Sequence, residues 1–252
     1  MRLEGKSAIV TGAGSGMGEA IAVLFAKEGA KVVVSDINGE AVNRVVEQIK
    51  ANGGDAIGIV TNVALQADVD HVVEQTVQTY GKLDILVNNA GVMDNFVPAG
   101  DVTDESWDRV IAINLSGPFK TARAAIKVME QQDRGGVIIN NASVGGLFGC
   151  RGGAAYVSSK HGLIGLTKNL AGTYGVYGKI RANAIAPGGV NTNINSTITA
   201  PHPLGLQAIG GLGRAPMGEA TQIAQVALFL ASDESNFVNG EVITADGGWT
   251  AG

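Results

Sequence analysis

Seven short runs of apolar and β-branched residues recur along the chain, separated by longer stretches with helical periodicity. Their apolar character is nearly continuous, as in strands that are buried on both faces, so they predict a parallel sheet covered by helices. Right-handed crossovers then give a doubly wound, Rossmann-type α/β fold. The seven expected strands span residues 7–12, 31–36, 56–63, 83–91, 136–143, 180–188 and 241–248.

The length of 252 residues, 45% of them apolar, suits one well-buried core. No repeat, linker or charge block divides the chain, so we expect a single domain over residues 1–252. The long irregular segment 189–218 contains no Asp, Glu, Lys or Arg between Gly189 and Gly213. That composition is unusual for a loop that faces water, so we interpret the segment as a substrate lid.

The charge balance excludes several classes of function. Charged residues make up 16% of the chain and the net charge is −5, so no basic field would attract nucleic acid or anionic membranes. The first expected strand begins within seven residues of the N-terminus and no 18-residue apolar run occurs, which predicts a cytoplasmic protein. Cys150 is the single cysteine, which cannot form an internal disulfide and is either a packing residue or a reactive thiol. No His, Asp or Glu cluster has metal-ligand spacing, so no metal is expected.

The glycine-rich stretch TGAGSGMG (11–18) follows the first expected strand and opens a helix. Backbone N–H groups at such a helix start can bind a pyrophosphate. An ordinary strand-to-helix turn is the alternative, and S-adenosylmethionine-binding folds use a similar turn. If the turn binds a dinucleotide, the contacting residues are Gly12, Ser15, Gly16, Met17 and Gly18.

Asp36 ends the second expected strand, where a carboxylate can accept hydrogen bonds from both ribose hydroxyls of an adenosine. A solvated strand-end carboxylate is the alternative. A 2′-phosphate would repel this carboxylate, and neither Ser15 nor Ile37 offers a compensating cation. The residues therefore favour NAD over NADP.

Tyr156 and Lys160 are four residues apart in AAYVSSK (154–160), so a helix would place them on one face. An ammonium about 4–5 Å from a phenol stabilises the phenolate by roughly 3–4 kcal/mol and would bring the pKa of Tyr156 close to working pH. Such a phenol can exchange a proton with an alcohol or a ketone while hydride moves to or from a nicotinamide. By itself the pair also fits a surface tyrosine and lysine. Ser143, at the end of an expected strand, adds a hydroxyl that could orient the substrate oxygen.

A series of motifs follows along the chain: TGAGSGMG, NNAG (88–91), INLSG with Asn114, Ser143, YVSSK and PGGVNT (187–192). Together and in this order, they resemble the short-chain dehydrogenase/reductases, in their subclass of about 250 residues. The resemblance covers nearly the whole chain. It implies that Tyr156 is the general acid/base and that Ser143 positions the carbonyl or alcohol. It also implies that Lys160 lowers the pKa of Tyr156 and holds the nicotinamide ribose, and that Asn114 binds a water linking Lys160 to solvent.

The same resemblance implies further contacts with the cofactor. One group of residues would lie beside the adenine-side ribose, and a second group would lie along the nicotinamide. A third group, Asn62 and the residue after it, would contact the adenine; many relatives carry Asp in place of Asn62. These residues are Asn89, Ala90 and Gly91, then Pro187, Gly188, Val190 and Thr192, and finally Asn62 and Val63.

The expected substrate walls are apolar and favour a small neutral secondary alcohol or its ketone, because an uncompensated charge would be costly there. Arg151 is the exception: it either clamps a carboxylate or faces outward. The walls are Met93, Phe96, Val144, Leu147, Phe148, Ile194, Ile198, Leu204 and Leu206.

The pattern therefore predicts an NAD(H)-dependent alcohol dehydrogenase/ketone reductase. An NADP-dependent 3-oxoacyl-(acyl-carrier-protein) reductase and a non-catalytic dinucleotide-binding sensor are the alternatives. By resemblance the protein is a homotetramer, assembled through the helices that follow Asn114 and Ser143 and through the C-terminal strand.

Overall fold

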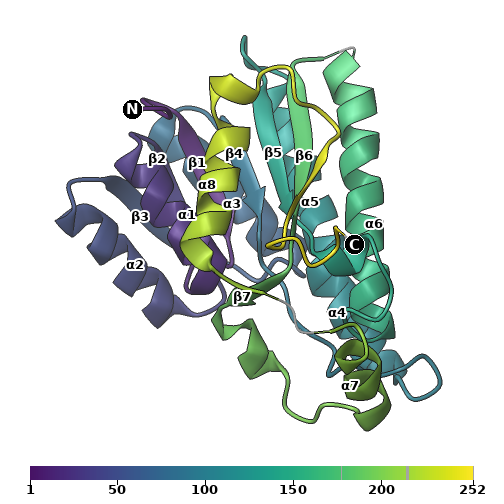
Figure 1. Cartoon of the computed structure of the whole chain (residues 1–252). Coiled ribbons are helices and arrows are strands. Elements are labelled where there is room, and N and C mark those ends of the chain that lie inside the picture. The colour runs from purple at the N-terminus through teal and green to yellow at the C-terminus, as the bar shows by residue number, and fades with distance from the viewer. Residues whose placement is uncertain (177, 214–215, 252) are drawn as a thin grey trace.

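Seven parallel strands form the central sheet, in the order β3-β2-β1-β4-β5-β6-β9 (Figure 1). The computed structural model describes residues 1–176, 178–213 and 216–251. All seven expected strands are confirmed, most of them with slightly shorter ends. They are β1 (Ser7–Thr11), β2 (Lys31–Asp36), β3 (Asp55–Val60), β4 (Ile85–Asn88), β5 (Gly136–Asn141), β6 (Ile180–Pro187) and β9 (Val242–Ala245).

Helices cover both faces of the sheet, as Figure 1 shows. One face packs against α1 (Gly16–Lys27), α2 (Gly39–Ala51) and α8 (Ala220–Ala231). The other packs against α3 (Gln66–Tyr80), α5 (Gly117–Met129) and α6 (Ala154–Leu170), with α4 (Asp104–Ile111) against α6.

The alternation of side chains along each strand explains why the sheet is buried on both faces. In β1, Ala8 and Val10 belong to the cluster under α1, α2 and α8, whereas Ile9 belongs to the cluster under α3 and α5. Successive strand residues point to opposite faces, so both sets must be apolar. The nearly continuous apolar runs of the sequence are the direct result.

The segment that we expected to be irregular contains regular structure. β7 (Gly189–Asn191) pairs in parallel with β8 (Met217–Glu219) in a separate two-stranded sheet, and α7 (Pro203–Gly210) lies between them in sequence. Proline at the first position of a helix costs no hydrogen bond, which fits the start of α7. Residues 214–215 of the expected lid lie outside the described part of the chain.

Long-range hydrogen bonds hold this segment beside the chain that follows β4. The side-chain oxygen of Asn95 accepts the backbone N–H of Thr199 at 2.8 Å, and the backbone oxygen of Asn95 accepts that of His202 at 2.8 Å. The hydroxyl of Thr197 accepts the N–H of Met93 at 3.0 Å. The segment therefore lies over the carboxyl ends of the strands, where ligands of open α/β sheets bind. No helix in the described residues is both long and apolar enough to cross a membrane.

Candidate active site

A cleft of about 530 Å³ opens between β1 and β4, where the strand order of the parallel sheet reverses. Nine of the residues expected to contact a dinucleotide line it, brought together from four separate parts of the sequence. They are Gly12, Ser15, Gly16, Met17, Asp36, Asn89, Ala90, Gly91 and Thr192.

The glycine turn leaves room that other residues would fill. Gly12 has φ of 63°, and a Cβ there would lie 2.8 Å from the Cα of Ala90. Ser15 makes no side-chain cap to α1, so the first N–H groups of this helix have no side-chain acceptor from that position. Gly18 has a packing role. A Cβ at Gly18 would lie 2.1 Å from the carbonyl oxygen of Gly12, so the absence of a side chain at Gly18 allows α1 to pack on the turn. The turn thus fits the phosphates of a dinucleotide.

The carboxylate of Asp36 lies in the cleft and accepts the N–H groups of Gly14 at 2.9 Å and Asn38 at 3.0 Å. Arg44 also lines the cleft, a residue that the sequence argument did not consider. Its guanidinium forms two hydrogen bonds of 2.7 Å to the carboxylate of Glu19. Arg44 is the one cation among the residues that line this cleft, and it is therefore already paired.

Asn62 and Val63 are not among the lining residues of this cleft. The side-chain oxygen of Asn62 accepts the N–H of Ala64 at 3.0 Å, and Val63 is buried beside Gly117. Their expected contact with adenine stays a prediction.

A second cleft of about 280 Å³ adjoins the first and shares Met17, Thr192 and Ile194 with it. Ser143 and Tyr156 lie at this cleft with the expected cofactor residues Pro187, Gly188 and Val190. The expected walls are only partly confirmed. Met93, Phe96, Val144 and Ile194 line the cleft; Leu147, Phe148, Ile198, Leu204 and Leu206 do not, and Arg151, Asn195, Ile209, Met217 and Trp249 do.

Tyr156 lies in the first turn of α6, and Ser143 lies two residues after the end of β5. The Tyr156 side chain is 6% exposed, and its ring packs so closely on Gly152 that a Cβ there would lie 2.5 Å from it. The hydroxyl of Ser143 accepts the N–H of Gly145 at 3.0 Å. The backbone of this turn therefore fixes the Ser143 oxygen beside the phenol.

Asp94 is a site residue that the sequence argument missed. Its fully buried carboxylate accepts the N–H groups of Gly153 and Tyr156, each at 2.8 Å. These groups belong to the first turn of α6, where the helix dipole favours a negative charge. Asp94 comes from the segment after β4 and so fixes the start of the helix that carries Tyr156.

Lys160 is buried on the same helix, one turn after Tyr156. Its ammonium nitrogen donates to the carbonyl oxygen of Asn141 at 2.9 Å and lies 5.7 Å from the ring centroid of Tyr156. Gly91 lies next to it, since a Cβ there would be 3.6 Å from this nitrogen. The nitrogen therefore points toward the junction of the two clefts, not into solvent.

The pKa values in the polypeptide alone differ from our expectation. Burial raises the pKa of Tyr156 above its ordinary value; a hydrogen bond with Ser143 lowers it, and the charge of Asp94 raises it. Burial also lowers the pKa of Lys160 to about 8. The expected fall of the Tyr156 pKa is wrong for this state, because burial of the phenol disfavours the charged phenolate.

Asn114 is fully buried in a π-helical turn, Ala112–Ser116, a distortion that is frequent at functional sites. Its side chain accepts the N–H of Val92 at 2.9 Å and donates to the carbonyl oxygen of Val92 at 2.9 Å and to the hydroxyl of Ser159 at 3.2 Å. It thus ties the chain after β4 to α6.

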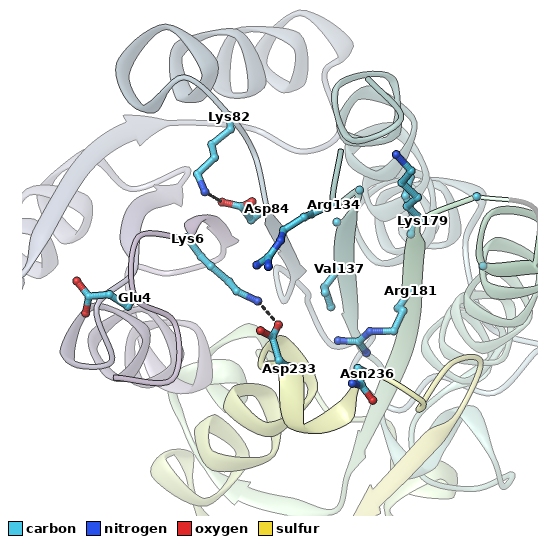
Figure 2. A pocket seen from close by; sticks show the side chains of 15 residues that line it. Glu4, Lys6, Lys82, Asp84, Arg134, Val137, Lys179, Arg181, Asp233 and Asn236 are labelled. Atoms are coloured by element: carbon cyan, nitrogen blue, oxygen red, sulfur yellow. Dashed lines mark hydrogen bonds and ion pairs between the residues drawn. The ribbon is translucent and has the colours of Figure 1, made fainter. Parts of the chain in front are cut away.

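Another cavity, of about 560 Å³, lies at the opposite edge of the sheet, near the amino ends of β1, β4, β5 and β6 (Figure 2). Four of its eight charged side chains form ion pairs with one another: Lys6 with Asp233 at 2.7 Å and Lys82 with Asp84 at 2.9 Å. It lies away from Tyr156 and from the strand ends where such folds bind ligands. No group of three or more His, Cys, Asp or Glu side chains in the described part of the chain could hold a metal ion.

Comparisons with known proteins agree with this geometry. The family model described as "Enoyl-(Acyl carrier protein) reductase" matches residues 12–250. The 3beta-hydroxysteroid dehydrogenase 2 of Eggerthella lenta is 41% identical, over 99% of this chain and 96% of its own. The chain is a short-chain dehydrogenase/reductase. The 3-oxoacyl-(acyl-carrier-protein) reductase FabG of Thermotoga maritima is 40% identical, over 98% of this chain and 99% of its own.

The structure of levodione reductase gives a TM-score of 0.90 at 35% identity and covers 99% of both chains. This short-chain dehydrogenase/reductase therefore shares both sequence and fold with enzymes of the family. Family membership makes it an oxidoreductase that uses a nicotinamide dinucleotide.

Proposed function

We propose that the protein is an NAD(H)-dependent oxidoreductase that interconverts a secondary alcohol and its ketone. One observation carries the proposal: Ser143 and Tyr156 lie in a cleft that adjoins the glycine-lined cleft, with the Lys160 nitrogen buried beside them. The dinucleotide, when bound, supplies or accepts hydride. The residues that would hold it are Gly12, Ser15, Gly16, Met17, Asp36, Asn89, Ala90, Gly91, Lys160, Pro187, Gly188, Val190 and Thr192.

Tyr156 transfers the proton in this proposal, and Ser143 holds the substrate oxygen beside it. Because burial raises its pKa, the phenol is protonated at neutral pH and can donate to the oxygen of a ketone. In the opposite direction the phenolate accepts the proton of the alcohol, so oxidation should become faster as pH rises. Lys160 stabilises the phenolate, and Asn114 links the helix of Tyr156 and Lys160 to the chain after β4.

The proposal favours NAD because of the charges at the adenosine end of the cleft. Asp36 places a carboxylate there, and the nearby cation of Arg44 is paired with Glu19. A 2′-phosphate would therefore meet a net negative surface, whereas two ribose hydroxyls would meet an acceptor.

The substrate cleft supports a small substrate with a mainly apolar body. Met93, Phe96, Val144, Ile194 and Ile209 contribute walls to a volume of only about 280 Å³. We therefore expect the part of the substrate that lies against these walls to be small and uncharged.

An NADP-dependent 3-oxoacyl-(acyl-carrier-protein) reductase is the second candidate. The 40% identity to the Thermotoga maritima reductase favours it, whereas Asp36 argues against the cofactor. A screen separates the two: secondary alcohols with NAD⁺ and NADP⁺ in one arm, 3-oxoacyl thioesters with NADH and NADPH in the other. Oxidation of small alcohols with NAD⁺ supports the first candidate, and NADPH-dependent reduction of thioesters supports the second.

We also propose that the protein is a homotetramer. A cavity between α5 and α6 is lined by Phe119, which is 45% exposed, and by Leu166 and Tyr174. An apolar face of this kind suits an interface between copies. Light scattering coupled to size exclusion should give four times the mass of one chain, and Phe119→Asp should reduce it; a monomeric wild type would contradict the proposal.

A further inference from the structure

Arg151 lies between two aromatic rings at the substrate cleft. Its guanidinium carbon is 4.7 Å from the ring centroid of Phe148 and 5.0 Å from that of Trp249. Arg151 and Trp249 both line the cleft that contains Ser143 and Tyr156. Arg151 thus lines the cleft with its Nε shielded from solvent, so its side chain does not simply face outward.

Backbone features hold the two side chains in place. Cys150 has φ of 62°, a left-handed conformation that is unfavourable for a residue with a side chain and is concentrated at functional sites. At the other end of the chain, the carboxylate of Asp246 accepts the N–H groups of Gly248 at 2.9 Å and Thr250 at 2.8 Å. Trp249 lies between these two residues, so its position is built into a hydrogen-bonded turn.

The stack contains donors without acceptors. Nε of Arg151 and Nε1 of Trp249 are shielded from solvent and have no hydrogen-bond partner among the described residues. The Arg151 guanidinium donates from Nη1 to the carbonyl oxygen of Gly149 at 3.0 Å. No carboxylate of the described chain forms an ion pair with this cation. Buried donors are normally satisfied, so an acceptor from outside the chain is the natural partner.

We propose that Arg151 and Trp249 bind a second oxygen of the substrate, carried in addition to the hydroxyl or carbonyl that reacts at Tyr156. This inference rests on the proposed function. The substrate class is therefore a hydroxy or oxo compound with a further oxygen acceptor, and an unpaired guanidinium suits a carboxylate best. A substrate without that oxygen leaves both donors unpaired, and a site built to bond an oxygen discriminates strongly against such a molecule.

Binding can be tested independently of turnover in the Tyr156→Phe variant with saturating NADH. Calorimetry would compare cyclohexanone with 1,4-cyclohexanedione and 4-oxocyclohexane-1-carboxylate. We expect the carboxylate, and to a smaller degree the dione, to bind at least tenfold more tightly than cyclohexanone. Adding Arg151→Met should remove this preference by weakening the binding of the carboxylate and the dione without weakening that of cyclohexanone, and Trp249→Phe should reduce the preference in part.

Two further variants keep the outcome clear. Arg151→Gln retains N–H donors without charge, so it should keep the gain for the dione and lose the gain for the carboxylate. Lys31→Met is the matched control, because Lys31 stacks on Tyr80 at 5.6 Å but lies outside the cleft. Its preference should equal that of the parent.

Equal affinity for the three ketones, or an equal loss for all three in Arg151→Met, would overturn the inference. Lack of turnover of every alcohol and ketone by the wild-type enzyme would instead contradict the proposed function, while the binding comparison would still stand. The two failures are thus distinguishable.

Discussion

The carboxylate of Asp94 accepts the backbone N–H of Tyr156 at 2.8 Å, so a buried charge lies beside the residue proposed to transfer the proton. The same carboxylate caps the helix and raises the pKa of the phenol. Asp94 therefore helps to position Tyr156 and adds to the rise in its pKa that burial causes.

Asp94→Asn should lower the pKa of Tyr156, because it removes a negative charge that opposes the phenolate. The pH at which alcohol oxidation reaches half of its maximum should fall. The new side-chain amide would direct its own N–H donors at the backbone N–H of Gly153 or of Tyr156, which would then lack an acceptor. The variant should therefore lose about 1–3 kcal/mol of stability. The pH profile of kcat and thermal unfolding measure the two effects, and a profile shifted to higher pH would contradict the first.

Cofactor choice should depend on Asp36 and on the pairing of Arg44. Asp36→Ala removes an acceptor for the ribose hydroxyls, so the KM for NAD⁺ should rise roughly 10–100-fold and discrimination against NADP⁺ should narrow. Adding Glu19→Gln releases the guanidinium of Arg44 from its partner and should improve use of NADP⁺ further.

Glu40→Gln is the control for Glu19→Gln, because Glu40 is an exposed acid on α2 outside the cleft. Kinetic titration with both cofactors measures the preference in each variant. An unaltered preference in Asp36→Ala would contradict the ribose contact, and equal effects of the Glu19 and Glu40 changes would contradict the role of Arg44.

Stability should increase with pH because Lys160 is buried. Its pKa is about 8 in the folded chain and 10.5 ordinarily, so the unfolded chain binds more protons between these two values. The free energy of unfolding should therefore rise with pH across this window, and the burial cost is fully present below pH 8.

Urea unfolding at several pH values should show this rise in wild type and not in Lys160→Met. Lys168→Met, an exposed position on the same helix, is the control and should keep the rise. A rise of equal size in Lys160→Met would assign it to other groups.

The sheet could be predicted because each buried parallel strand has a continuous apolar run, and the glycine turn and strand-end acid are local signals. Tyr156 and Lys160 could be found for the same reason, since four residues on a helix fix their relation. The structure brings most of the expected cofactor residues into one cleft.

The missed features depend on contacts between distant parts of the chain. Asp94 caps a helix that begins far along the sequence, and Trp249 reaches Arg151 only after the C-terminal strand is placed. Helix α7 has few local signals and is held by hydrogen bonds to Asn95 and its neighbours. The pKa of Tyr156 was misjudged because spacing along a helix does not reveal how completely water is excluded.

The most direct test of the central claim is the rate of hydride transfer in Tyr156→Phe, measured in single turnover with bound NADH and the best ketone from the screen. The account predicts unchanged NADH affinity and a rate reduced by about 10²–10⁴-fold, because only the proton donor is lost. The control is Tyr80→Phe, because the Tyr80 hydroxyl donates to Asp55 on the far edge of the sheet. This control should transfer hydride at the wild-type rate. A Tyr156→Phe rate equal to that of wild type would contradict the account.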